Sequence, residues 1–271
     1  MKALIKIGGS LLDDPASRHD IARQIAEVAA SGVLVTVVHG GGKQMTRFLE
    51  ERGIQSRFVG GLRVTTEETI DAVLKVLAGT VNTQLAAALC AAGVRAVGLT
   101  GIDAGLATAE QLDPELGLVG RVVASDSSVL DVLTHAGMLP VVACVAGGTH
   151  GQVFNVNGDS MAVAIASGWE VDRLVFLTDV PGVLDDKKEV IPFLTVEDCG
   201  KLIDTGVASG GMQAKLNAAT GAVAGGVHEV SIVKGSDPSV VKRLFKGEEI
   251  GTRIVGPHHD PLFPIMTAIM P

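Results

Sequence analysis

The sequence predicts an α/β fold, specifically a three-layer α/β/α sandwich with a mainly parallel central sheet. Short apolar, β-branched runs alternate with longer helical stretches along most of the chain. Near-continuous apolar strands separated by helices are typical of a parallel sheet that is covered on both faces. Hydrophobic residues make up 47% and charged residues 19% of the 271 residues, and the 34 glycines suit tight turns between strands and helices.

The individual elements follow in order along the chain. Apolar runs rich in Val, Ile and Leu predict strands at 3–7, 33–38, 96–99, 139–145, 173–177 and 229–233. Helical stretches that lie between and after these runs predict helices at 17–30, 42–52, 67–91, 129–136, 159–167 and 211–224. An alternation of this kind places helices on both faces of one sheet.

Three stretches depart from the alternation. Glycines flanked by β-branched residues predict a hairpin or flap at 57–65, and a second one at 117–126. The last 16 residues contain four prolines and no periodicity, so we expect an extended or poorly ordered tail. We therefore expect one domain over residues 1–254, with lobes of about 1–167 and 168–254, followed by a proline-rich tail at 255–271.

Composition excludes several classes of protein. A net charge of −8 and an aromatic content of 3%, with no Tyr and one Trp, argue against a nucleic-acid-binding surface. Cys90, Cys144 and Cys199 form no CxxC or Cys/His pattern, and the first two lie in apolar runs that predict core positions. No uncharged apolar run approaches the ~20 residues that a membrane span needs. We expect a soluble cytoplasmic protein without a membrane segment.

Glycine-rich turns follow several of the predicted strands. They occur in "KIGGS", "HGGGK", "NVNGD" and "LTDVPGV", and "SGGMQAK" precedes a late helix. Glycine loops at helix N-termini present backbone N–H groups that suit phosphate, and parallel strands gather such loops at one edge. Any one of these loops is an ordinary α/β turn as readily as a binding loop. Their recurrence, twice with a nearby lysine, indicates an extended anionic ligand such as a nucleoside triphosphate.

Two common nucleotide-binding patterns do not fit. A Walker motif would need glycine at Val37 and Ser or Thr at Gln44, and the dinucleotide pattern would need glycine at Met45. As an ordered set, however, the motifs resemble the amino acid kinase family over residues 2–254. They are "IKIGGS", "VVHGGGKQM", "GGLRVT", "FNVNGDSMA", "LTDVPGVL", "SGGMQAKLNAA" and "GTRI". The combination of "GLRVT" with "NVN-D" is most similar to the branch that acts on N-acetyl-L-glutamate in arginine biosynthesis.

The resemblance implies phosphoryl transfer from MgATP to the side-chain carboxylate of N-acetyl-L-glutamate. Lys6 and Lys215 match the family's two lysines beside the transferred phosphoryl group, and Asp159 matches the aspartate that orients both. Such a transfer depends on positioning and on cationic stabilisation of the phosphoryl oxygens. Lysine supplies a compact positive charge for that purpose.

The resemblance also implies the ligand-binding residues. Those matching the substrate site are Gly41, Gly42, Arg63 and Asn155. Those matching the nucleotide site are Gly8, Gly9, Thr178, Asp179, Gly182, Val183, Val207, Ala208 and Ser209. Asn157 could cap a helix or contact a ligand. No metal-binding residues are predicted, so Mg²⁺ is expected to bind through the phosphates of ATP and water. The histidines, including His39, His150 and the pair at 258–259, are expected to be structural or superficial.

The sequence departs from the family pattern at a few positions. Gly158 stands where the family usually has Ala, and "RVTTEE" replaces the commoner "RVTD". Two other functions stay open. One is a kinase for carrier-bound aminoadipate or glutamate in lysine biosynthesis, although the acidic "TTEET" after the arginine flap disfavours an acidic carrier protein. The other is a non-catalytic amino-acid or nucleotide sensor, for which transition-state lysines would be unnecessary.

The start of the sequence suggests an oligomeric state by the same resemblance. The chain begins almost directly at its first strand, whereas arginine-inhibited hexameric members carry an extra N-terminal helix. We therefore expect an arginine-insensitive homodimer. Initial rates with and without millimolar arginine test this expectation, and a shift of activity would contradict it.

Overall fold

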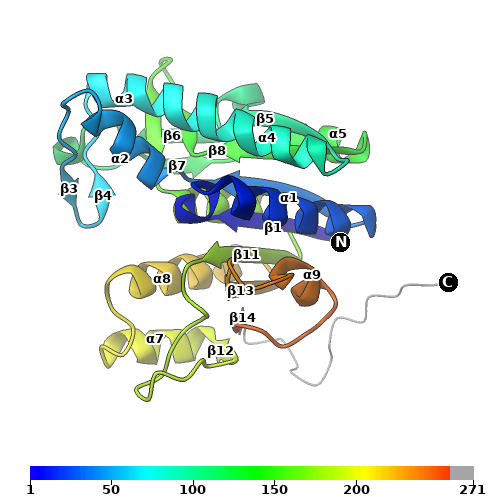
Figure 1. The fold of residues 1–271 in the computed structure, drawn as a ribbon. Coiled ribbons are helices and arrows are strands. Elements are labelled where there is room, and N and C mark those ends of the chain that lie inside the picture. Colours follow the sequence, from blue (N-terminus) through cyan, green and yellow to red (C-terminus); the bar gives the residue numbers. More distant parts are fainter. Residues whose placement is uncertain (257–271) are drawn as a thin grey trace.

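A computed structural model describes residues 1–256 of the chain. One eight-stranded sheet runs through it (Figure 1), and all its neighbouring strands are parallel except β13 and β14. Its strands in spatial order are β12 (Phe193–Thr195), β14 (Thr252–Val255), β13 (Glu229–Lys234), β11 (Arg173–Thr178), β1 (Lys2–Ile7), β2 (Leu34–His39), β8 (Met138–Ala143) and β5 (Arg95–Thr100). The predicted α/β class with a mainly parallel sheet is confirmed.

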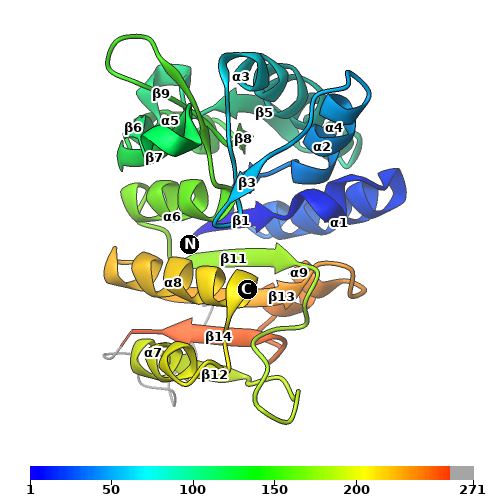
Figure 2. The same ribbon diagram turned by 90° about the vertical axis from the view of Figure 1, so that its left-hand side faces the viewer.

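Helices cover both faces of this sheet, so the fold has three layers (Figure 2). One face carries α1 (Pro15–Ala30), α2 (Gly42–Glu50), α3 (Glu67–Val73), α4 (Asn82–Ala91) and α9 (Val240–Phe245). The other carries α5 (Ser128–His135), α6 (Gly158–Gly168), α7 (Val196–Asp204) and α8 (Gly210–Ala224). Each face has its own buried hydrophobic cluster. All six predicted helices are present, within two residues of the predicted ends.

Strand alternation decides which layer each side chain joins. Ile5 and Ile7 pack in the cluster under α1, whereas Leu4 packs in the cluster under α6. Because successive side chains of a strand point to opposite faces, Lys6 lies on the α6 face, at the carboxyl end of β1. The sequence thereby directs a lysine of a buried strand toward the start of α6.

The long helix at 67–91 is continuous and contains an irregularity. A π-helical stretch, η2 (Leu74–Val81), joins α3 to α4. By length and composition this is the one helix in residues 1–256 that could cross a membrane. Its apolar side is packed on the sheet, however, with Val73, Leu77, Leu85 and Leu89 in the core. It is therefore a core helix of the fold.

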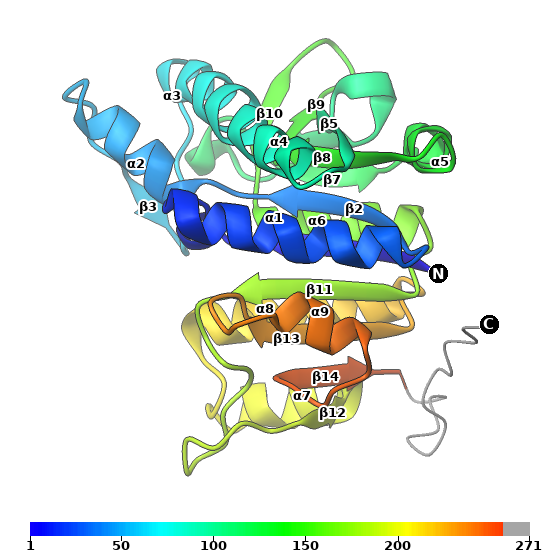
Figure 3. The ribbon, with the colours of Figure 1, turned by 45° about the vertical axis from the view of Figure 1, so that its right-hand side comes forward.

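Smaller elements complete the fold. A four-stranded closed barrel consists of β6 (Thr108–Gln111), β7 (Val119–Ala124), β9 (Val145–Gly147) and β10 (Val153–Val156). A hairpin of β3 (Phe58–Val59) and β4 (Leu62–Arg63) projects beside α2 (Figure 3). Short 3₁₀ turns are η1 (Gly9–Leu12), η3 (Asp103–Gly105) and η4 (Pro114–Leu116).

Three details of the sequence prediction change. The hairpin at 57–65 is confirmed, but the hairpin at 117–126 is wrong: the stretch holds one strand, β7, paired with β6 and β10. Gly120 allows this because a Cβ there would lie 2.6 Å from the Phe154 Cβ. The strand at 139–145 divides at Cys144 into β8 and β9. Cys90 is exposed on the outer side of α4, not a core residue.

The predicted tail falls largely outside the structure. Val255 is buried and ends β14. The remaining prediction, of an extended or poorly ordered stretch with His258 and His259, concerns residues 257–271 and lies outside the described residues.

Candidate active site

Three charged side chains meet at the carboxyl end of β1. Lys6 Nζ lies 2.6 Å from Asp159 Oδ1, and Lys215 Nζ lies 3.4 Å from Asp159 Oδ2. They come from β1, the first turn of α6 and the first half of α8. The side chains are 12%, 15% and 22% exposed for Lys6, Asp159 and Lys215. One carboxylate thus holds two ammonium groups in a largely enclosed place.

Electrostatics keep the Asp159 carboxylate ionised. Burial alone would raise the pKa of Asp159, but the two nearby ammonium groups outweigh burial and hold the pKa below its usual range. Asn157 supports this arrangement from outside the ion pairs. Its Oδ1 accepts hydrogen bonds from the N–H groups of Asp159 (2.9 Å) and Ser160 (3.1 Å). Of the two roles open to Asn157, the structure shows the N-cap of α6.

The glycine loops after β1 and β2 touch each other. A Cβ on Gly9 would lie 2.9 Å from both Gly41 Cα and Gly42 N, so this approach requires glycine. Gln44 links the loops further, because its Nε2 donates to the Gly9 carbonyl at 3.0 Å. Gly8 is tied to the third strand end through its N–H, which donates to Leu177 O. The predicted gathering of these loops at one edge is thereby present.

Arg63 is held over the start of α2. Its Nη2 donates to Gly42 O at 3.1 Å and to Thr46 Oγ1 at 2.7 Å, its Nη1 donates to Ser56 Oγ, and its guanidinium stacks on Phe58 at 4.7 Å. The Arg63 side chain is buried, with only 9% of the residue exposed. Even so, no carboxylate within residues 1–256 lies at ion-pair distance from it. Burial lowers the pKa of Arg63, and the more remote Glu50 carboxylate offsets this only in part. An enclosed cation without a carboxylate partner is suited to an anionic ligand.

Two adjoining hollows share Arg63, Gly42 and Phe58. One, of about 180 Å³, is lined by Gly40–Gly42, Asn155, Asn157 and Gly158 among others. The second, of about 560 Å³, reaches Gly9, Ser10 and Lys43. Asn155 Nδ2 donates to Thr65 Oγ1 at 3.1 Å, which fixes its amide at the wall of the first hollow. The structure thus brings the four predicted substrate-binding residues to one cavity.

Gly158 adjoins both the cavity and the charged cluster. A Cβ at this position would lie 3.2 Å from Lys6 Cε and 3.5 Å from Cys144 Sγ. The family's usual alanine would therefore press lightly on Lys6. Gly158 thus lines the cavity and lies next to the Lys6 side chain.

The predicted nucleotide residues are less closely joined. Thr178 is buried, and its Oγ1 donates to Asp179 Oδ1 at 3.1 Å. Val183 is buried. Its N–H donates to Thr252 Oγ1 and its carbonyl oxygen accepts from the Ile191 N–H, so both backbone groups already have protein partners. Val207 and Ser209 are exposed and Ala208 is buried at the start of α8. No hydrogen bond in the described part of the chain joins 207–209 to the turn at 178–183, and their common role stays a prediction.

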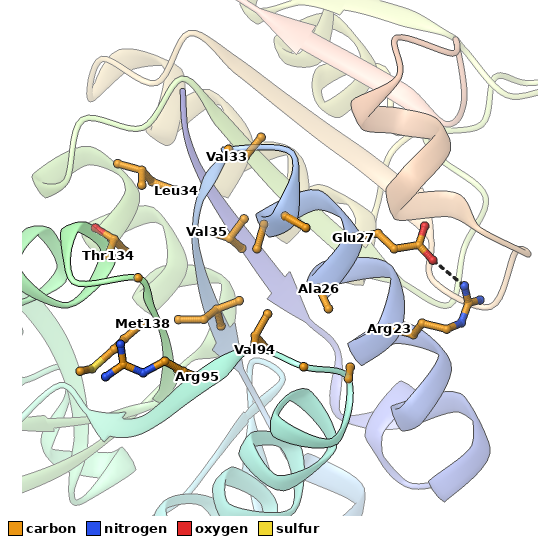
Figure 4. Close-up of a pocket in the computed structure, with 17 residues that line it drawn as sticks. Arg23, Ala26, Glu27, Val33, Leu34, Val35, Val94, Arg95, Thr134 and Met138 are labelled. Carbon is orange, nitrogen blue, oxygen red and sulfur yellow. Dashed lines mark hydrogen bonds and ion pairs between the residues drawn. The ribbon is translucent and has the colours of Figure 1, made fainter. Parts of the chain in front are cut away.

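A different hollow lies at the opposite end of the sheet (Figure 4). It measures about 540 Å³ and is lined by residues at the amino ends of β2, β5 and β8, including Val35, Arg95 and Met138. Arg23 at its rim is already paired with Glu27 at 2.8 Å. Although it is larger than the cavity lined by Arg63 and Asn155, it has no glycine loop or lysine pair. Ligands of parallel α/β sheets bind at the carboxyl ends of strands, so the smaller cavity is the candidate active site.

Several supporting residues were not predicted. Thr46, Ser56 and Phe58 hold Arg63, and Gln44 holds Gly9. Thr46 was the one with a usable signal, since it lies one helical turn after Gly42. No group of three His, Cys, Asp or Glu side chains in residues 1–256 is arranged to hold a metal ion.

This fold and site define a class of protein: an α/β protein that gathers glycine loops, two lysines and an arginine at the carboxyl ends of its strands, an arrangement suited to an anionic ligand. Comparison with known families agrees, because the amino acid kinase family matches residues 1–234. The chain belongs to the amino acid kinase family.

Known relatives indicate which branch of this family the chain resembles. An acetylglutamate kinase of Solibacter usitatus is 59% identical over 94% of this chain and 99% of its own length. One of Bartonella tribocorum is 42% identical over 93% of this chain and 88% of its own length. Among solved structures, an N-acetylglutamate synthase from Neisseria gonorrhoeae, complexed with coenzyme A and N-acetyl-glutamate, is similar with a TM-score of 0.84 and 25% identity. That alignment covers 94% of this chain and 59% of the synthase.

Proposed function

We propose that this chain is an acetylglutamate kinase, which transfers the γ-phosphoryl group of ATP to the side-chain carboxylate of N-acetyl-L-glutamate in arginine biosynthesis. The 59% identity with the Solibacter usitatus enzyme supports this activity and pathway. The observation that carries the substrate side is the enclosed Arg63 guanidinium, which has no carboxylate partner in residues 1–256 and lines the same cavity as Asn155. A small molecule with carboxylates and an amide fits these groups.

The chemistry requires little beyond positioning and charge. A carboxylate oxygen of the acceptor forms a bond to the γ-phosphorus as the bond to the β–γ bridging oxygen breaks, which leaves ADP and an acyl phosphate. Negative charge is spread over the phosphoryl oxygens during the transfer. Lys6 and Lys215 stabilise that charge from two sides, and Asp159 keeps both ammonium groups in place. The N–H groups of Gly41 and Gly42 meet the reacting end of the acceptor.

The nucleotide occupies the C-terminal side of the site in this proposal. Gly8 and Gly9 meet the phosphates, the turn at 178–183 and the segment 207–209 enclose the nucleoside, and Lys215 reaches the γ-phosphate. Glycine N–H groups and lysines suit a triphosphate, and no protein cage for a metal is present among the described residues. Mg²⁺ would be carried on the phosphates of ATP and water, where it would offset their charge.

The test is ATP-dependent formation of an acyl phosphate trapped as its hydroxamate. N-acetyl-L-glutamate, glutamate, aspartate and a carrier-bound aminoadipate are compared as acceptors. Turnover with N-acetyl-L-glutamate alone is the expected result. Preference for a carrier-bound acceptor would favour the lysine-pathway kinase, and ATP binding without turnover on any acceptor would favour a sensor.

Arg63 provides a sharper test of the acceptor site. Arg63→Lys keeps the charge but loses the planar fork, and a hydrogen bond to a charged group contributes ~1.5–3 kcal/mol, or ~10–10²-fold in kcat/KM for the acceptor. The KM for ATP should change little. Steady-state kinetics with each substrate varied measure both. Arg57→Lys, an exposed arginine beside the same hairpin, is the matched control, and equal losses in the two variants would contradict the assignment.

The proposed quaternary structure is a homodimer in the cytoplasm. β5 forms one edge of the large sheet, and no strand of the described residues pairs with its outer side. Such edges are available for pairing with another chain. Light scattering coupled to size exclusion measures the mass of the assembly, and a monomer at micromolar concentration would contradict this part.

A further inference from the structure

A buried polar pair lies behind the second glycine loop. His39 ends β2 and is fully buried, and its Nδ1 lies 2.9 Å from the Gly40 carbonyl oxygen. Asn82, which begins α4, places its Nδ2 at 3.0 Å from His39 Nε2 and at 2.8 Å from Val141 O. These contacts join the glycine loop to β8 and α4. The chemistry described so far does not use either residue.

The partners of the imidazole decide its tautomer. A carbonyl oxygen can only accept, so Nδ1 carries the proton and donates to Gly40 O. The bare Nε2 then accepts from one amide hydrogen of Asn82, whose other hydrogen goes to Val141 O. Burial lowers the pKa of His39 to about 4, so the ring is neutral at physiological pH. Every polar atom of the ring is satisfied in this single arrangement.

Fixing the Gly40 carbonyl also fixes the next N–H group. The peptide between Gly40 and Gly41 is planar and trans, so its C=O and N–H point in opposite directions. With the oxygen directed at His39, the Gly41 N–H is directed away from the core. Within residues 1–256, the N–H groups of Gly41 and Gly42 donate to no protein atom. Both glycines line the cavity beside Arg63.

We propose that Asn82 and His39 are positioning residues that orient the Gly41 N–H toward the acceptor carboxylate. This inference rests on the proposed function, in which that N–H group meets the reacting end of N-acetyl-L-glutamate. A hydrogen-bond donor that is already held in place binds the acceptor carboxylate without the cost of ordering the loop. The pair supplies that order to a loop of three glycines, which would otherwise be flexible.

The π-helical stretch explains how Asn82 reaches the loop. Hydrogen bonds of a π-helix span five residues, so Leu77, Val81 and Asn82 share one side of the helix. A Cβ on Gly41 would overlap Leu77 Cδ2 and would lie 3.4 Å from Val81 Cγ2. Leu77 and Val81 of this irregular turn therefore pack against Gly41, and the same turn directs the Asn82 side chain at His39. Irregular turns of this kind are frequent at functional sites.

Gly98 on the edge strand gives access to this pair from outside the site. A Cβ on Gly98 would overlap Asn82 Oδ1, and the three heavy atoms nearest to that Cβ all belong to Asn82. The φ of Gly98 is not left-handed, so the backbone itself does not require glycine. Gly98→Ala would therefore displace Asn82 without touching the cavity.

The experiment is a double-mutant cycle of Asn82→Ala and Gly98→Ala, with Gly200→Ala as the matched control. Gly200 lies in α7 with open space around its Cα. We expect both single variants to raise the KM for N-acetyl-L-glutamate by ~3–10-fold, the value of one hydrogen bond, with the KM for ATP unchanged. The double variant should be no worse than Asn82→Ala alone, because the methyl group then fills the vacated space.

Other outcomes overturn the proposal. They are additive losses in the cycle, an unchanged KM in Gly98→Ala, or equal rises of both KM values together with a lowered Tm. Size exclusion of each variant separates these effects from a changed assembly.

¹⁵N NMR of the His39 ring gives a readout that does not depend on turnover. The Nδ1–H form should be present in the wild type, and the Nε2 resonance should shift in Asn82→Ala because that nitrogen loses its hydrogen-bond donor, whereas an Nε2–H form in the wild type would overturn the pair even if the kinase activity held. If the wild type showed the Nδ1–H form but no turnover, the proposed function would be contradicted instead.

Discussion

Replacing Lys6 by alanine is expected to lower kcat by ~10²–10³-fold, the usual effect of removing one preorganised charge-stabilising donor. Lys6 contributes one of the two ammonium groups that flank Asp159, at 2.6 Å from its Oδ1. Its loss matters most when charge develops on the phosphoryl oxygens, so the KM for either substrate should change less than kcat. Initial rates at saturating ATP and acceptor measure the effect.

Lys2→Ala is the matched control for this variant. Lys2 points to the same face of β1 as Lys6, at the first residue of the strand. Its Nζ lies 3.0 Å from Asp131 Oδ1. It lies at the other end of the strand, so its removal should leave kcat within about two-fold, as for a surface ion pair. If Lys2→Ala lowered kcat as far as Lys6→Ala does, the loss would be structural and the role of Lys6 would be contradicted.

Asp159→Asn should produce the second large effect. The amide keeps the shape of the carboxylate but leaves Lys6 and Lys215 without a counter-charge, and the two ammonium groups would repel each other. We expect kcat to fall by ~10²-fold, as for loss of a positioned electrostatic group. The free energy of unfolding should also fall, by up to the ~3–5 kcal/mol that breaking a buried ion pair costs. Asp131→Asn, the partner of Lys2, is the control that should retain kcat.

The pH dependence of stability follows from the same carboxylate. The folded-state pKa of Asp159 lies below the usual value of an aspartate because of the two ammonium groups, so its contribution to stability is fully present above the unfolded pKa. It is lost as the pH falls through the folded pKa. The difference in unfolding free energy between the wild type and Asp159→Asn should therefore be constant near neutral pH and should shrink below about pH 4. Urea unfolding at several pH values measures it, and a difference that grew on acidification would contradict the ion-pair geometry.

Six of the eight strands of the large sheet could be predicted, because each is a local run of apolar residues; β12 and β14 were not predicted. Runs such as the one that forms β11 are apolar on both faces, and glycines or helical segments delimit them. The barrel strands carry no comparable signal. β6 and β9 have four and three residues, and their pairing depends on contacts between distant segments, such as Gly120 against Phe154.

The site shows the same division between local and distant information. Lys6, Asp159 and Lys215 could be named from motifs, and the structure brings them together, while their catalytic role stays a prediction. The supports of the site could not be named. Asn82 reaches His39 across 43 residues only because a π-helical stretch turns it inward, and no sequence period reveals that turn.

The most direct test of the central claim is a ³¹P NMR measurement on ATP, Mg²⁺, N-acetyl-L-glutamate and the enzyme in one tube. If Lys6, Asp159 and Lys215 transfer the phosphoryl group to the acceptor held by Arg63, an acyl-phosphate resonance should grow in step with ADP. Neither signal should grow with Lys6→Ala on the same timescale. ADP formed with inorganic phosphate and no acyl phosphate, or no change while both substrates bind, would contradict the assignment of this site as a carboxylate kinase.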